Sequence, residues 1–324
     1  MKFREYAMAN FLVRAVFCIL VYLTCSVHAQ QCTHKPTIIT PKNRIHMEKP
    51  KTTQSRILIP DQRMKFHVEY DQSVLDLDVA TEIKGVVAEV VEHVSRILSV
   101  KQDPGFFLIP KDCVDPDNAV NINGQWYCTL DSCYAAACGE VTVPENLSEP
   151  CFDCEDDGTN CIEFGGVTDE TSALSQAVHF TLFVGSLSSQ CGEGLIAYAS
   201  ACYIDDITDR PLAGFMNICP FGLNLDRERL LSTVQHEIFH ALGFSHSLYA
   251  LYRDENGNPL TPREENGYPP VDPVTGLFLW SSRVIQELTL DWDYVGGTTQ
   301  RTVQALVTPN IVREARAHFR CPSL

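Results

Sequence analysis

The stretch His236-Glu237-Ile238-Phe239-His240-Ala241-Leu242-Gly243-Phe244-Ser245-His246 is the part of the sequence from which the rest can be interpreted. If it is helical up to Gly243, His236 and His240 stand one turn apart on the same face, so that both imidazoles can bind one metal ion. Glu237 lies beside the first ligand, where a carboxylate can take a proton from a metal-bound water. The spacing predicts one zinc ion held by His236 and His240, with Glu237 as the catalytic base.

The residues around this motif support a helix that is buried on one face. Asn224 or Asp226 can cap its start, and Gly243 can end it through a left-handed turn. The apolar residues of the segment recur at helical spacing on the side opposite the two histidines, at Leu231, Val234, Ile238 and Leu242. The competing interpretation is a pair of surface histidines separated by a chance glutamate.

His246 completes the longer pattern His-Glu-x-x-His-x-x-Gly-x-x-His. A glycine turn lets the chain double back, so that a third imidazole can reach the metal. This spacing favours His246 as the third zinc ligand. The alternative is a histidine on a loop that binds water.

Composition and charge set limits on the class of protein. The chain has 324 residues, of which 45% are hydrophobic and 20% charged, as in an ordinary globular protein of one large domain or two lobes. Its formal net charge of −16 argues against nucleic acid or an anionic membrane surface as a partner. Such acidity is typical of a soluble protein.

The N-terminus and the cysteines indicate export. Lys2, Arg4 and Arg14 precede an apolar run over 15–27, which predicts a signal peptide over 1–29 and a secreted protein. The alternative, an uncleaved signal anchor, would associate the protein with the membrane at the cell surface. Twelve of the 14 cysteines lie beyond this leader, and in an oxidising compartment we expect most of them in disulfides. A zinc ribbon at Cys151, Cys154 and Cys161 is disfavoured, because no second C-x-x-C pair follows.

The remaining chain predicts an α+β fold. Residues 30–60 are basic and proline-bearing, as in a linker or pro-segment. Helical periodicity predicts a long helix over 79–100, and short helices are expected over 281–288 and 310–319. Strands are expected over 65–70, 105–110, 178–184, 195–199 and 214–220, the last as an edge strand because Pro220 closes it. The cysteine-rich segment over 113–161 should be loop-rich and held by disulfides.

A family resemblance rests on the motif and on stretches around it. Residues 236–245 resemble the motif of the leishmanolysin-like (invadolysin) zinc endopeptidases, a branch of the metzincins, and 194–202, 210–220 and 306–321 are also similar. The resemblance covers the chain from about residue 60 to its end. It implies a metzincin-like fold, His236 and His240 as zinc ligands, Glu237 as the base, and hydrolysis of extracellular or surface proteins with a role in cell adhesion or migration.

The sequence departs from this family in its third ligand. In the family the third histidine follows a long insertion after the glycine, and a methionine turn comes later still, whereas no methionine follows Met216 here. Three interpretations stay open: His246 substitutes, the site has two protein histidines, or the sequence is a fragment. If Cys32 is kept apart, an odd number of cysteines remains, which favours the fragment.

Cys32-Thr33-His34 resembles the family's pro-segment cysteine, whose thiolate would bind the open zinc position and silence the zymogen. A disulfide is the alternative for Cys32. We therefore expect a signal peptide over 1–29, a pro-segment over 30–60, a catalytic domain over 61–246 and an insertion with an incomplete C-terminal lobe over 247–324. The predicted function is a zinc metalloendopeptidase acting on protein or peptide substrates. The alternative is a secreted, catalytically weak binding or decoy form.

Overall fold

A five-stranded mixed sheet, with strand order β1-β14-β15-β13-β3, forms the centre of the fold. The computed structural model describes residues 38–39, 43–45, 47, 62–100, 105–115, 119–122, 125–155, 159–167 and 178–322. The predicted signal peptide, Cys32 and most of the predicted pro-segment lie outside these residues. The strands of the sheet are β1 (Arg44–Ile45), β3 (Phe66–Tyr70), β13 (Phe180–Gly185), β14 (Ala197–Asp205) and β15 (Pro211–Ile218).

The sheet is mixed because one pair of strands runs against the other three. β3 and β15 are parallel to β13, β1 is parallel to β14, and β14 is antiparallel to β15. The predicted strands over 65–70 and 178–184 correspond to β3 and β13, and the predicted strand over 195–199 is the start of the longer β14. A mixed α+β fold is thereby confirmed.

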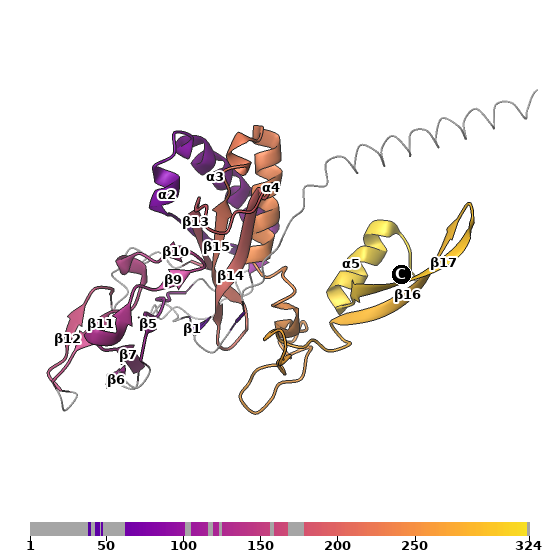
Figure 1. The fold of residues 1–324 in the computed structure, drawn as a ribbon. Coiled ribbons are helices and arrows are strands. Elements are labelled where there is room, and N and C mark those ends of the chain that lie inside the picture. The colour runs from indigo at the N-terminus through magenta and orange to yellow at the C-terminus, as the bar shows by residue number, and fades with distance from the viewer. Residues whose placement is uncertain are drawn as a thin grey trace, which may run out of the picture.

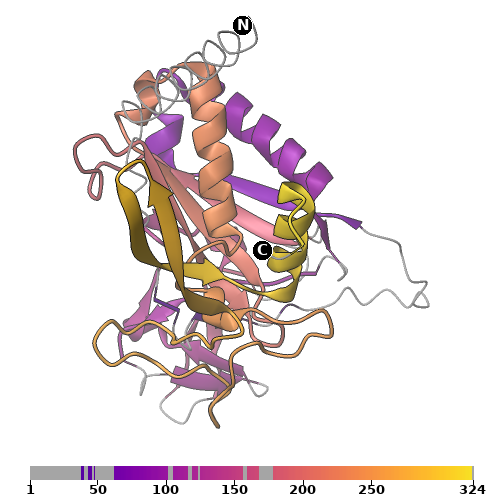
Figure 2. The ribbon, with the colours of Figure 1, turned by 90° about the vertical axis from the view of Figure 1, so that its right-hand side faces the viewer.

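Two helices cover one face of the sheet, as Figures 1 and 2 show: α3 (Ala80–Ile97) and α4 (Arg227–Ala241). The long N-terminal helix predicted over 79–100 is α3, and its buried residues recur at helical spacing: Ile83, Val86, Val87, Val90 and Val94. A short helix, α2 (Gln72–Leu75), precedes it. Side chains alternate across each strand, so Leu182 of β13 packs against these helices while the adjacent Phe183 packs on the other face.

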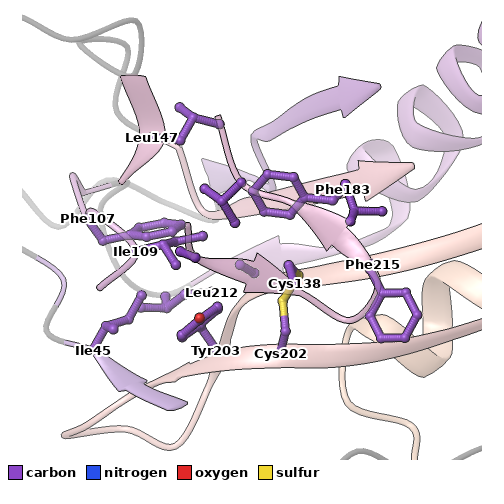
Figure 3. Close-up of a cluster of buried hydrophobic side chains, with 14 of the residues drawn as sticks. Ile45, Phe107, Ile109, Cys138, Leu147, Phe183, Cys202, Tyr203, Leu212 and Phe215 are labelled. Atoms are coloured by element: carbon purple, nitrogen blue, oxygen red, sulfur yellow. A yellow bond between two sulfur atoms is a disulfide. The ribbon is translucent and has the colours of Figure 1, made fainter. Parts of the chain in front are cut away.

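The cysteine-rich segment covers the opposite face with short strand pairs (Figure 1). Its disulfides are Cys113–Cys128, Cys133–Cys151, Cys138–Cys202, Cys154–Cys161 and Cys191–Cys219. Figure 3 shows the Cys138–Cys202 bond inside the apolar cluster beside Phe215, where it ties the segment to β14. The predicted disulfide framework is confirmed, and Cys151 and Cys154 belong to two different disulfides rather than to a zinc ribbon.

The small strands pair locally, apart from β2 and β4, which bracket the helices α2 and α3. The pairs are β2 (Gln62–Arg63) with β4 (Ser99–Val100), β5 (Asp112–Cys113) with β8 (Cys133–Tyr134), β6 (Ala119–Ile122) with β7 (Gln125–Cys128), β9 (Ala137–Cys138) with β10 (Val141–Thr142), and β11 (Cys151–Asp153) with β12 (Ile162–Phe164). The strand expected over 105–110 is reduced to isolated bridges at Gly105 and Ile109.

The expectation that residues 214–220 form an edge strand is wrong. β15 lies between β14 and β13, so both of its edges are paired. Pro220 does not interrupt this pairing because β15 ends at Ile218, and the backbone N–H of Cys219 still donates to the carbonyl of Ile196 at 2.8 Å. A proline just beyond the last ladder bond removes no donor that the sheet needs.

The C-terminal part consists of a long hairpin and a helix: β16 (Ile285–Tyr294), β17 (Gly297–Leu306) and α5 (Pro309–Phe319). α5 confirms the helix expected over 310–319. The helix expected over 281–288 is wrong, because Leu288, Leu290 and Trp292 alternate with polar residues at the period of a strand. In the part of the chain that the structure describes, no helix is both long and apolar enough to span a membrane.

Candidate metal centre and catalytic helix

Helix α4 is held in place by its cap and by its apolar face. The Asp226 carboxylate accepts a hydrogen bond from the backbone N–H of Arg229 at 3.0 Å, so Asp226 is the cap that the sequence offered. Val234 and Ile238 are fully buried against the sheet and α3. His236 is exposed and His240 half-buried, on the open side of the helix. α4 thus carries both histidines one helical turn apart, and their binding of a metal stays a prediction.

The imidazoles of His236 and His240 converge. Their Nε2 atoms lie 3.0 Å apart, and the rings are perpendicular with centroids 4.6 Å apart. Two nitrogens on one tetrahedral zinc, at about 2.0–2.1 Å from the ion, would be separated by roughly 3.3 Å. The pair therefore has a separation close to that of two ligands of a single ion.

The tautomer of His240 is set by the turn that follows the helix. Its Nδ1 lies 2.7 Å from the backbone carbonyl of Phe244. A carbonyl can only accept, so Nδ1 carries the proton and, in the neutral ring, the Nε2 lone pair faces His236. Metal-binding histidines are commonly oriented by such a bond to a carbonyl. Burial and the neighbouring His240 lower the pKa of His236, which favours the neutral form that binds metals.

Glu237 is the residue that follows His236 on α4. Its side chain is almost fully buried, and it accepts a hydrogen bond from the backbone N–H of Ala199 in β14. Burial raises the pKa of Glu237 to about 7, and the bond from Ala199 opposes that rise. A carboxyl group with a pKa near neutrality can both accept and return a proton at physiological pH.

His246 lies on the turn beyond Gly243. It is half-buried, and burial lowers its pKa. Among the residues that the structure describes, no group of three or more His, Cys, Asp or Glu side chains is placed to hold a metal ion. The structure thus brings together His236 and His240 but not His246, whose ligation stays a prediction.

The turn after α4 uses a glycine and a tyrosine. Gly243 has a φ of +116°, a conformation that side chains with a Cβ rarely adopt, as expected of the glycine that ends the helix. The Tyr252 hydroxyl donates to the carbonyl of Gly243 at 3.0 Å. Tyr252 was not predicted from the sequence, because nothing in the motif indicates which later side chain reaches the turn.

A buried cluster of charges lies at the β14–β15 turn and was also missed. The Asp209 carboxylate, whose side chain is 1% exposed, is bound by Arg44 at 2.6 Å, by Arg253 at 2.7 Å and by Arg263 at 2.7 Å. Arg44 lies on β1, while Arg253 and Arg263 follow α4. Asp209, on the β14–β15 turn, therefore joins β1 to the segment that follows α4.

The chain is similar in sequence to leishmanolysin and to leishmanolysin-like peptidases. Residues 154–324 match the family described as leishmanolysin. The leishmanolysin-like peptidase of Drosophila pseudoobscura pseudoobscura is 35% identical over 287 residues, which cover 84% of this chain and 41% of that protein. That of Caenorhabditis elegans is 37% identical over 196 residues, covering 58% of this chain and 28% of the relative.

A more distant relative is the ciliated left-right organizer metallopeptidase of Xenopus laevis, which is 28% identical over 218 residues. The match covers 63% of this chain and 29% of the relative. The chain spans about two fifths of the length of the Drosophila proteins that it matches.

Proposed function

The chain belongs to the leishmanolysin family of metallopeptidases, and from this membership we propose that it is a zinc-dependent endopeptidase. The observation that carries the proposal is the pair of converging imidazoles on α4, whose Nε2 atoms lie 3.0 Å apart. Family membership supports metallopeptidase chemistry in general. The imidazole pair supports zinc, because neutral imidazole nitrogen is one of its preferred ligands.

In the proposed reaction, the Nε2 atoms of His236 and His240 would hold the ion. Zinc, when bound, would supply a Lewis acid that polarises the scissile carbonyl. Glu237 takes a proton from the attacking water and later gives it to the leaving amine. The carbonyl of Phe244 keeps His240 in the tautomer with a proton on Nδ1, as the distance of 2.7 Å requires.

The proposed substrates are extracellular or cell-surface polypeptides. The apolar run after Lys2, Arg4 and Arg14 supports secretion or attachment at the cell surface. An extended substrate can bind by adding a strand to the edge of a sheet. β15 is not proposed as such a binding strand, because it is paired on both sides.

Zinc removal tests the proposed activity. We expect the purified chain to contain one zinc ion by elemental analysis, to cleave peptides from a mixed library, and to lose that cleavage in 1,10-phenanthroline and regain it when zinc is added back. A chain that cleaves peptides equally well without metal would contradict the proposal. Stoichiometric zinc without turnover would instead support the binding or decoy form.

His246 is proposed as the third protein ligand. We expect His246→Ala to weaken zinc binding by more than the roughly 10-fold to 100-fold cost of losing an outer-shell partner, because a direct ligand would be removed. The measurement is competition with a chromogenic chelator. His318→Ala, at an exposed position on α5, is the matched control and should bind zinc as the parent does. Equal affinity of His246→Ala and the parent would show that His246 is not a ligand.

A further inference from the structure

We infer that Tyr252 is a positioning residue for the metal centre. Its hydroxyl orients the His240 ring indirectly, through the turn at Gly243 and Phe244. The inference rests on the proposed zinc-dependent function and adds a residue that lies outside the His-Glu-x-x-His motif. Tyr252 touches neither histidine in this proposal. It acts on the backbone that sets the tautomer and the ring orientation of His240.

The path from Tyr252 to His240 has two hydrogen bonds. The Tyr252 hydroxyl donates to the carbonyl of Gly243 at 3.0 Å, and His240 Nδ1 donates to the carbonyl of Phe244, the next carbonyl along, at 2.7 Å. Fixing the Gly243 carbonyl fixes the peptide plane between Gly243 and Phe244. The orientation of this plane constrains the backbone of Phe244, and therefore the direction of the Phe244 carbonyl that His240 contacts.

A second restraint on this peptide plane matters because the residue before it is a glycine. Gly243 has no Cβ, and its φ of +116° lies in a region where glycine keeps wide conformational freedom. Backbone bonds already close the helix, from Gly243 N–H to the His240 carbonyl at 3.1 Å and from Phe244 N–H to the Phe239 carbonyl at 3.0 Å. The Phe244 N–H and the Gly243 carbonyl belong to one planar peptide unit and point in opposite directions. The bond from Tyr252 therefore holds the second end of a plane that the Phe244 N–H already holds at the first.

Tyr252 is itself held firmly. Its ring packs edge-on against Tyr249, with centroids 5.5 Å apart, and its own carbonyl accepts from the N–H of Leu260 at 2.9 Å. The next residue, Arg253, is bound to the buried Asp209 carboxylate. Burial raises the pKa of the Tyr252 hydroxyl, so the group stays protonated and remains a donor. A donor fixed on both sides can orient a flexible turn.

The test is Tyr252→Phe in the full chain, with Tyr249→Phe as the matched control. Both variants lose one phenol oxygen from the same aromatic pair, but of the two hydroxyls it is that of Tyr252 that donates to the turn. We expect Tyr252→Phe to bind zinc about tenfold more weakly, the lower end of the range for outer-shell partners. Tyr249→Phe should match the parent within twofold, and the thermal midpoints of both variants should stay close to that of the parent.

A second readout does not depend on the metal. In the metal-free chain, nitrogen NMR of the imidazoles should show His240 protonated on Nδ1 in the parent and in Tyr249→Phe, and a mixture of tautomers in Tyr252→Phe. Zinc affinity within twofold of the parent together with an unchanged His240 tautomer in Tyr252→Phe would overturn the inference. If the parent binds no zinc, the proposed function fails, while the tautomer comparison still decides whether Tyr252 orients His240.

Discussion

Replacing Glu237 with glutamine should lower peptide turnover by roughly 10² to 10⁴-fold, the usual contribution of a positioned acid–base group. The amide cannot take a proton from water, yet its oxygen can still accept the bond from the Ala199 N–H that the carboxylate accepts now. Zinc content should not change, because Glu237 is proposed as the base and not as a ligand. Initial rates with a fluorogenic peptide, taken together with elemental analysis, measure both quantities.

Glu228→Gln is the control for this prediction. Glu228 is an exposed glutamate in the first turn of the same helix, so the substitution makes the same chemical change without touching the site. Its turnover should stay at the parent value. Cleavage that persists in Glu237→Gln at the parent rate would remove Glu237 from the mechanism and with it the main chemical argument for hydrolysis by this helix.

Local patterns in the sequence were enough to predict helix α4. The positions of His236, His240 and Val234 follow from 3.6-residue periodicity, and Asp226 and Gly243 mark the ends through capping. The same periodicity predicted α3. Each of these signals lies within a few residues of the structure that it specifies, so tertiary contacts were not needed to interpret it.

The wrong predictions concern segments whose structure depends on contacts with residues distant in the sequence. Pro220 suggested an edge strand, but the order of strands in the sheet depends on β14 and β13 rather than on β15 alone. The segment before Leu288 looked helical because short apolar runs fit either period, and the pairing of β16 with β17 settles it as a strand. Tyr252 is nine residues from the carbonyl that it binds, and no motif links the two.

Asp209 is the clearest case of a contact that local sequence does not reveal. Its partners Arg44, Arg253 and Arg263 are 165, 44 and 54 residues away along the chain. Asp209 also has a φ of +59°, a left-handed conformation that aspartate and asparagine tolerate better than most residues. An acidic residue on a turn between strands would ordinarily be taken for an exposed one.

Asp209→Asn should destabilise the fold by about 3–5 kcal/mol, the usual cost of leaving one side of a buried ion pair without its partner. Asparagine keeps the size and the left-handed backbone, so the loss reports the charge. The side chains of Arg44 and Arg263 are 11% and 13% exposed, which leaves their charges little water to replace the carboxylate. Thermal unfolding under non-reducing conditions should show a midpoint lower by roughly 6 to 20 °C.

The size of the loss depends on which member of the cluster is removed. Arg253→Gln should cost less than Asp209→Asn, because the carboxylate keeps two guanidinium partners and one repulsive cation is gone. Asp206→Asn, at an exposed position on the same turn, should stay within about 0.5 kcal/mol of the parent. If Asp209→Asn were no more harmful than Asp206→Asn, the three arginines would not depend on Asp209 for their charge balance. The larger loss at Asp209 would instead show that one carboxylate at the β14–β15 turn joins β1 to the segment after α4.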